Sequence, residues 1–212
     1  MIPAVGILRR SVAWLLYERR YGLDTAREVR LAELGLEHPE RTHYGPSGWR
    51  TLEHILPASD VSPDDVFVDL GSGKGRAVYL AARYPFKRVI GVEIGKELHE
   101  IAERNLRAVR RRLACQDVEL VNSDVLEYEL PDDVTVVFMF NPFGGTIFEA
   151  VLAKIVGSID RNPRSLRLVY GNPVEEQRVL TTGRARLVRE HRTAHSDVSA
   201  EHAGRICLYE LR

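Results

Sequence analysis

Short apolar runs alternate with amphipathic stretches over most of the chain after residue 65. The apolar runs are expected to be β-strands and cover residues 66–70, 88–94, 118–121, 135–140 and 166–170. The stretches expected to be helices cover residues 74–84, 96–114 and 146–159. The nearly unbroken apolar run at 135–140 indicates a strand buried on both faces. The alternation predicts an α/β fold with a doubly wound, mostly parallel sheet and right-handed crossovers.

The end of the chain departs from this alternation. After a helix expected near residues 175–180, apolar runs at 185–189 and 205–209 follow one another without a helix between them. Neighbouring strands joined in this way pair antiparallel, so the sheet is expected to finish with an antiparallel hairpin. The loop between the two runs carries His191, His195, Asp197, Glu201 and His202. Because these residues include no tight ligand pair, we interpret the segment as a surface loop and predict no metal site.

The first part of the chain, residues 1–57, reads as helix and loop, with a short helix expected at 51–56. We expect a helical N-terminal extension, or lid, in front of one globular domain at 58–212. The apolar run at the start is interrupted by Arg9 and Arg10 and is too short to cross a bilayer. It favours a helix packed on the protein, or on the second subunit of a homodimer, over a peripheral membrane helix.

The charge balance indicates which kinds of partner to expect, and the cysteine content indicates the cellular compartment. The chain has 30 basic and 30 acidic side chains, so no overall field attracts nucleic acid or an acidic membrane. The densest arginine cluster, between residues 107 and 112, lacks interleaved aromatic residues, and we interpret it as the solvated face of a helix. Cys115 and Cys207 stand outside any metal-binding or redox motif, which fits a reducing, cytoplasmic location.

The turn after the first predicted strand has the most specific pattern, with Asp69 two positions ahead of Gly71, Gly73 and Gly75. Glycines allow a sharp turn and a close approach to a ligand at a helix N-terminus. A Walker A loop needs serine or threonine after its lysine, and Gly75 stands there. A dinucleotide-binding loop needs its third glycine where Arg76 stands. The leading carboxylate suits a ligand with an ammonium group, so the pattern favours an amino-acid-bearing nucleoside over a pyrophosphate.

Two further acidic residues follow later strands at the same edge of the predicted sheet. Glu93 ends the second strand, where a carboxylate can accept from both ribose hydroxyls, and Ile94 follows it. Asp124 follows the third strand and could accept a hydrogen bond from an adenine amino group. Strand ends are often polar, so each residue alone is as readily explained without a ligand. Their order and shared edge favour a nucleoside site.

The segments 66–75, 91–94, 123–124 and 141–143 together resemble class I S-adenosylmethionine-dependent methyltransferases, and the resemblance covers residues 60–212. It implies a seven-stranded sheet in the order 3-2-1-4-5-7-6 with an antiparallel seventh strand. It also implies that S-adenosylmethionine is the cofactor. The residues that would hold it are Asp69, Gly71, Ser72, Gly73 and Gly75 for the methionine part, Glu93 for the ribose, and Ile94, Asp124 and Val125 for the adenine.

The Asp-Leu-Gly-Ser-Gly motif also resembles the glycine loop of two branches of these enzymes, the DOT1 branch and the ATP-synthase-subunit lysine methyltransferase branch. In such relatives a Tyr-x-Pro-Ser/Thr segment precedes the glycine loop, and Tyr44 to Ser47 match it. The match implies a lid in which Ser47 borders the cofactor and His43 and Tyr44 shape the acceptor pocket. A structural turn explains Gly45 and Pro46 equally well.

Contacts to the methyl acceptor are expected where the fourth strand ends, at Asn141, Pro142 and Phe143. A similar Asn-Pro-Pro-Tyr/Phe motif grips N–H groups in methyltransferases that act on amino groups, although this sequence lacks the second proline. The alternative is that Asn-Pro simply ends a buried strand. We predict Asn141 and Tyr44 as catalytic contacts, with Asn141 also bordering the cofactor, and Asn172 as part of the same pocket.

The sequence therefore predicts an S-adenosylmethionine-dependent methyltransferase that acts on a nitrogen or oxygen of a small molecule or a protein side chain. Two alternatives stay open, a nicotinamide-dependent oxidoreductase and a non-catalytic scaffold of the same fold. No nucleic-acid partner and no membrane span are indicated.

Overall fold

The computed structural model describes residues 18–192 and 204–212. Some predictions concern parts of the chain outside these residues. They are the apolar N-terminal run, with its predicted role in a homodimer, and the loop residues His195, Asp197, Glu201 and His202. His191 is described and belongs to a strand, where its ring stacks on that of His54 with the centroids 4.4 Å apart.

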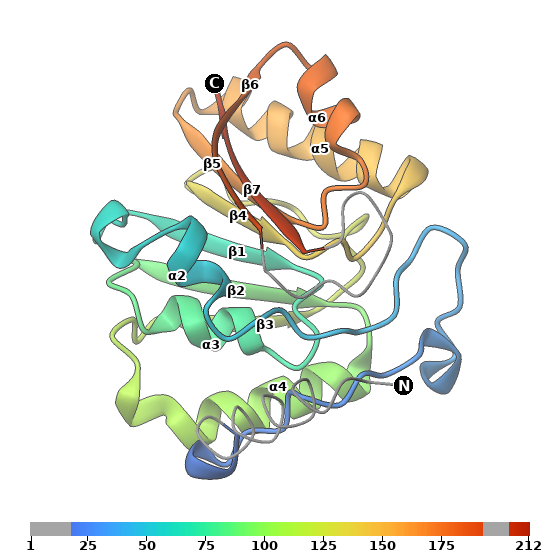
Figure 1. Ribbon diagram of the computed structural model, residues 1–212, viewed down its shortest axis with the longest axis vertical. Helices are drawn as coiled ribbons and strands as arrows, with labels where there is room; N and C mark the ends of the chain where they lie inside the picture. Colours follow the sequence, from blue (N-terminus) through green and yellow to red (C-terminus); the bar gives the residue numbers. More distant parts are fainter. Residues whose placement is uncertain (1–17, 193–203) are drawn as a thin grey trace.

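The molecule is built on a seven-stranded sheet with the order β3-β2-β1-β4-β5-β7-β6 (Figure 1). The five strands from β1 to β5 are parallel, while β7 pairs antiparallel with both β5 and β6. Both the predicted order and the antiparallel hairpin are confirmed. The strands are β1 Val66–Leu70, β2 Arg88–Glu93, β3 Val118–Asn122, β4 Val136–Met139, β5 Leu166–Gly171, β6 Ala185–Arg192 and β7 Arg205–Leu211.

Helices cover both faces of the sheet (Figure 1). Within the described residues, the α-helices are α2 Thr51–Ile55, α3 Arg76–Ala82, α4 Lys96–Val109, α5 Gly145–Arg161 and α6 Glu176–Thr181. Short 3-10 helices are η2 Leu31–Leu34, η3 Ala58–Asp60 and η4 Arg110–Arg112. The arginines at 107 and 110–112 are exposed, as expected for a solvated helix face.

The two faces of the sheet form two separate apolar layers. Successive residues of a strand point to opposite faces, and in β1 Phe67 packs with α2, α3 and α4 while Val66 and Val68 pack with α5 and α6. In β4 the same alternation separates Phe138 from Met139. Burial on both sides explains why these strands are apolar throughout.

The described part of the predicted N-terminal extension, residues 18–57, is mostly irregular rather than helical. Its glycines and prolines, such as Gly35, Pro39 and Pro46, interrupt helical hydrogen bonding. The segment crosses the carboxyl edge of the sheet and forms isolated bridges from Arg41 to Phe143 and from Val29 to Tyr44. The predicted boundary at residue 57 stays a prediction. Over the described residues, no helix has the length and apolar character needed to cross a membrane.

Candidate active site

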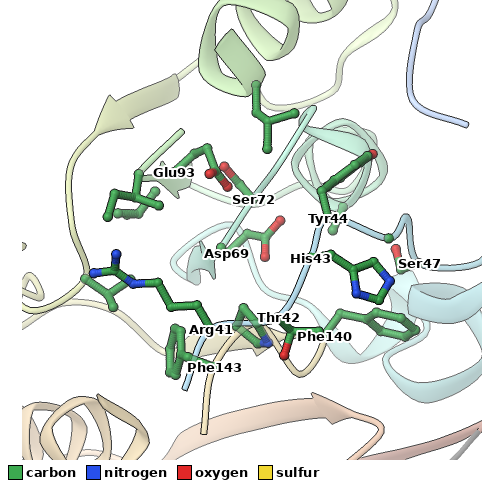
Figure 2. Close-up of a pocket in the computed structure, with 18 of the residues that line it drawn as sticks. Arg41, Thr42, His43, Tyr44, Ser47, Asp69, Ser72, Glu93, Phe140 and Phe143 are labelled. Carbon is green, nitrogen blue, oxygen red and sulfur yellow. The ribbon is translucent and has the colours of Figure 1, made fainter. Parts of the chain in front are cut away.

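A pocket lies at the carboxyl edge of the sheet, where the loops after β1, β2 and β4 meet (Figure 2). The empty space in it, counted out to its open mouth, is about 840 Å³. Residues 41–47 form its roof. The predicted cofactor residues that line it are Ser47, Asp69, Gly71, Ser72, Glu93, Ile94, Asp124 and Val125.

The loop after β1 needs glycine at the positions that contact its cover. Gly71 and Gly73 have φ values of +86° and +54°, which side chains rarely adopt. A Cβ atom on Gly71 would lie 2.5 Å from the Cβ of Pro142. A Cβ atom on Gly73 would lie 2.2 Å from two ring carbons of Tyr44. The loop is therefore closely covered by the roof and by the loop after β4.

The Asp69 carboxylate is buried in this pocket and has no hydrogen-bond or ion-pair partner among the described residues. It is 3% exposed and makes no hydrogen bond with residues 18–192 or 204–212. Burial, with a smaller contribution from the charge of Glu93, raises the pKa of Asp69 well above its usual value. The Ser72 hydroxyl nearby is also buried and has no hydrogen-bond partner among the described residues. A cationic ligand would pair with this carboxylate, which is otherwise costly to bury.

Glu93 holds the glycine loop from the neighbouring strand. One carboxylate oxygen accepts from the backbone N–H of Gly73 at 2.7 Å, and the other accepts from Gly95 at 2.8 Å. Burial raises the pKa of Glu93, while these backbone hydrogen bonds oppose the rise. Each oxygen keeps a lone pair that could accept from a ribose hydroxyl.

Asp124 has a partner that sequence reasoning missed. The Arg41 guanidinium pairs with Asp124 Oδ2 at 2.5 Å, and Oδ1 accepts from the Leu126 N–H at 3.0 Å. Arg41 comes from the roof and lines the pocket (Figure 2). No local pattern marks Arg41, because its partner lies 83 residues away in the sequence.

Two Asn-Pro pairs end neighbouring strands in the same strained conformation. Asn141 after β4 and Asn172 after β5 both have a φ of 48°, and a following proline restricts such residues further. The Asn172 side chain accepts from the Gly204 N–H at 2.9 Å. The Asn141 side chain makes no hydrogen bond with the described residues, although Phe140 and Pro142 on either side of it line the pocket.

Tyr44 covers the glycine loop with its ring and uses its hydroxyl elsewhere. The ring lies against Gly73, and the hydroxyl donates to the Thr25 carbonyl at 2.9 Å. Burial raises the pKa of Tyr44, so the phenol stays protonated. This geometry suits a residue that positions the loop. Its predicted catalytic contact stays a prediction.

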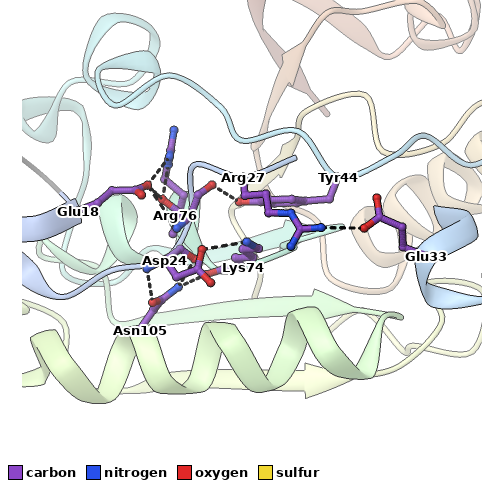
Figure 3. A network of polar contacts seen from close by, with 9 residues as sticks. Glu18, Asp24, Arg27, Glu33, Tyr44, Lys74, Arg76 and Asn105 are labelled. Atoms are coloured by element: carbon purple, nitrogen blue, oxygen red, sulfur yellow. Dashed lines mark hydrogen bonds and ion pairs between the residues drawn. The ribbon is translucent and has the colours of Figure 1, made fainter. Parts of the chain in front are cut away.

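Arg76, which breaks the dinucleotide pattern, anchors the N-terminal segment (Figure 3). Its buried guanidinium pairs with Glu18 at 2.9 Å and donates to the Thr25 hydroxyl and the Ser47 carbonyl, each at 2.8 Å. It also lies over the Trp49 ring, 4.3 Å from the centroid. Arg76, which stands where a dinucleotide-binding loop would have its third glycine, thus connects the roof to the helix after the glycine loop.

A family model described as "Histone methylation protein DOT1" matches residues 37–156, more than half of the chain. The chain belongs to the DOT1 family. The matched residues include the roof, the glycine loop and the loop after β4. The predictions of a methyltransferase and of S-adenosylmethionine as its cofactor are confirmed at the level of the family.

Relatives that resemble this chain in sequence differ in the acceptors that their names state. The H3 lysine-79 specific histone-lysine N-methyltransferase of Dictyostelium discoideum is 30% identical over 53% of this chain. The ribosomal RNA small subunit methyltransferase A of Alkaliphilus metalliredigens is 33% identical over 37% of it. The chain spans only 7% and 25% of these two relatives.

The fold itself is shared with solved methyltransferases. An RNA methyltransferase from Salinibacter ruber, crystallised with S-adenosyl-L-homocysteine, superposes with a TM-score of 0.51 and 19% identity. The alignment covers 78% of this chain and 92% of that one. At this identity the likeness concerns the fold and leaves the acceptor open.

Among residues 18–192 and 204–212, no group of three or more histidine, cysteine or acidic side chains is arranged to hold a metal ion. The polar groups that line the pocket include the carboxylates of Asp69, Glu93 and Asp124. These groups suit an organic cation that also carries hydroxyl groups.

Proposed function

We propose that this protein transfers a methyl group from S-adenosylmethionine to the amino nitrogen of a protein lysine side chain. The observation that carries the cofactor half of the proposal is the buried carboxylate of Asp69 beside the buried hydroxyl of Ser72, neither of which has a hydrogen-bond partner among the described residues. Both polar groups lack partners in the described protein, and a ligand with an ammonium group would supply one for Asp69.

The other polar groups of the pocket fit the same cofactor. Glu93 would accept from the ribose hydroxyls, and Asp124, held by Arg41, would accept from the adenine amino group beside Ile94 and Val125. When bound, the cofactor would supply a methyl group on a positively charged sulfur: the lone pair of a neutral amine would form the N–CH3 bond as the S–CH3 bond breaks, releasing S-adenosylhomocysteine, and the methylated ammonium could then lose its proton to solvent. The role of the protein is then to align that lone pair and to exclude water.

The surroundings of Asn141 support an amino acceptor. Asn141 is not itself among the residues that line the pocket, but its side-chain oxygen makes no hydrogen bond with the described residues, and the neighbouring Phe140, Pro142 and Phe143 give the pocket an apolar wall. An apolar wall disfavours the charged ammonium form of lysine, which lowers its pKa and exposes the lone pair needed for transfer. The roof leaves a covered site, which suits an inserted side chain. The zero net charge argues against a large nucleic-acid surface.

The experiment is to incubate the protein with isotopically labelled S-adenosylmethionine and, separately, with core histones and with ribosomes whose protein and RNA are afterwards divided. We expect label on lysine in a protein fraction, identified by mass spectrometry. Label in the RNA alone would show that the acceptor is a nucleic acid and not lysine. No label in any fraction would contradict the proposed activity.

Two matched variants test the acceptor contact. Asn141→Gly keeps the left-handed backbone accessible but removes the amide, and we expect turnover to fall about 10- to 100-fold with unchanged cofactor binding. Asn172→Gly makes the same change at the neighbouring strand end, and since Asn172, contrary to its predicted place, is not among the residues that line the pocket, we expect near wild-type turnover in the folded protein. Equal turnover in both variants would contradict the assignment of Asn141.

A further inference from the structure

A strap, residues 40–44, leads into the roof of the pocket and is hydrogen-bonded to the loop after β4. The Glu40 carbonyl accepts from the Gly144 N–H at 2.8 Å, and the Thr42 N–H donates to the Pro142 carbonyl at 2.9 Å. The strap therefore lies alongside the segment that begins with Asn141.

The Glu40 side chain caps helix α5. Its carboxylate accepts from the backbone N–H of Thr146 at 3.0 Å, the Thr146 hydroxyl at 2.7 Å and the N–H of Ile147 at 3.3 Å. The N-cap residue of α5 is Gly144, which has no side chain to fill this role. The first N–H groups of a helix lack partners within it and favour a carboxylate nearby. The hydrogen bonds from Thr146 accordingly lower the pKa of Glu40.

The start of α5 is held closely on two sides. Glu175, from the loop after β5, accepts from the Gly145 N–H at 2.8 Å. Gly145 has a φ of 56°, and a Cβ atom on it would lie 2.2 Å from the Glu40 carboxylate. The position of α5 therefore depends on two carboxylates from other parts of the chain.

Two other strap residues contact residues of the predicted cofactor site. Arg41 pairs with Asp124, and the Tyr44 ring covers Gly73. A displacement of the strap at Glu40 would thus act on the acceptor side, where Pro142 and Gly144 are bonded to it. Arg41 and Tyr44 would still hold the strap at the cofactor side.

We infer that Glu40 is a positioning residue for methyl transfer: by capping α5 from the strap, it fixes the Asn141–Pro142 segment relative to the methyl donor. Glu40 does not line the pocket and need not touch either substrate. The inference rests on the proposed function for its kinetic part only, because the capping itself can be measured without an acceptor.

The experiment compares Glu40→Ala, Glu40→Gln and the control Glu37→Gln, a nearby exposed carboxylate for which no hydrogen bond to the described residues is found. With core histones as acceptor, we expect kcat to fall about 10- to 100-fold in Glu40→Ala, while the KM for S-adenosylmethionine changes less than about twofold. Glu40→Gln should be intermediate, because its amide oxygen can still accept from Thr146 but carries no charge. Glu37→Gln should match the wild type.

Hydrogen exchange supplies the readout that needs no acceptor. In the complex with S-adenosylhomocysteine, we expect the amides of residues 144–147 to exchange faster in Glu40→Ala than in the wild type. Wild-type kcat in Glu40→Ala, or a parallel loss of kcat and cofactor binding, would overturn the inference. If the wild type methylates no lysine, the proposed function fails by itself. Unchanged exchange at residues 144–147 would then overturn the role of Glu40.

Discussion

Arg76 and Glu18 form an ion pair 2.9 Å long whose side chains are only 8% and 4% exposed. Arg76 begins the helix after the glycine loop, and Glu18 belongs to the N-terminal segment (Figure 3). The pair joins the N-terminal segment to the helix after the glycine loop, and Arg76 also donates to the Ser47 carbonyl of the roof, so Arg76 connects both parts of the N-terminal segment to this helix.

Replacing one partner of this pair leaves a buried charge alone. We expect Arg76→Met to lower the free energy of unfolding by about 3–5 kcal/mol, and the double variant with Glu18→Gln to lose less than the sum of the single changes. Chemical denaturation measures both. The exposed pair Arg50–Glu53 provides the control, where Arg50→Met should cost less than about 1 kcal/mol. Additive losses at Arg76 and Glu18 would show that the two side chains are not coupled.

Asp69 is expected to destabilise the cofactor-free protein. Asp69→Asn removes an unpaired buried charge, so we expect the variant to be more stable near neutral pH by about 1–2 kcal/mol. This corresponds to a Tm about 2–8 °C higher for a chain of this size. Differential scanning calorimetry without cofactor tests it, and a lower Tm for the variant would mean that Asp69 has a partner in the free protein.

The same gain should depend on pH. The pKa of Asp69 is raised in the folded protein above its value in the unfolded chain, so its contribution favours folding at low pH and is lost as the pH rises through the folded pKa. The stability advantage of Asp69→Asn over the wild type should therefore shrink as the pH falls through that raised pKa. Below it the wild-type carboxyl is protonated and, like the amide of the variant, carries no charge. An advantage that is constant from neutral to acidic pH would exclude this explanation.

The effect of the close contact between Tyr44 and Gly73 can be measured separately from the effect of backbone strain at Gly73. Gly73→Ala adds both a strained φ and a clash with the Tyr44 ring, and we expect a loss of about 1–3 kcal/mol in stability together with weaker cofactor binding. Gly183→Ala is the control, because its φ is +67° and nothing lies within 4 Å of the added Cβ. Thermal shifts with S-adenosylhomocysteine compare the two; equal effects would mean that only the strain matters.

The individual strands, the helices of the sheet and the glycine loop could be predicted because their signals are local, whereas the sheet order was implied by the resemblance to class I methyltransferases. The apolar run at 135–140 and the helical spacing after it depend on neighbours in the sequence. The spacing from Asp69 to Gly75 likewise lies within one turn. The predicted bounds of these elements differ from those observed by a few residues, since helix ends such as the start of α3 at Arg76 follow loop geometry.

The cover of the pocket could not be predicted in the same way. Arg41 pairs with Asp124 across 83 positions, and Glu40 bonds to Thr146 across 106. Neither has a periodic or motif signal, because each contact exists only after the sheet brings the two segments to one edge. The extension was expected to be helical from its apolar positions, yet its described part, residues 18–57, is mostly irregular apart from the short helices η2 and α2.

The most direct test of the account is a calorimetric titration of S-adenosylhomocysteine into the wild type and Asp69→Asn near neutral pH. The account predicts saturable binding at one site per chain in the wild type. It also predicts that the variant, although more stable, binds about 10- to 100-fold more weakly, as expected for the loss of a hydrogen bond to a charged group. Equal affinities would contradict the central claim that the unpaired Asp69 carboxylate holds the cofactor.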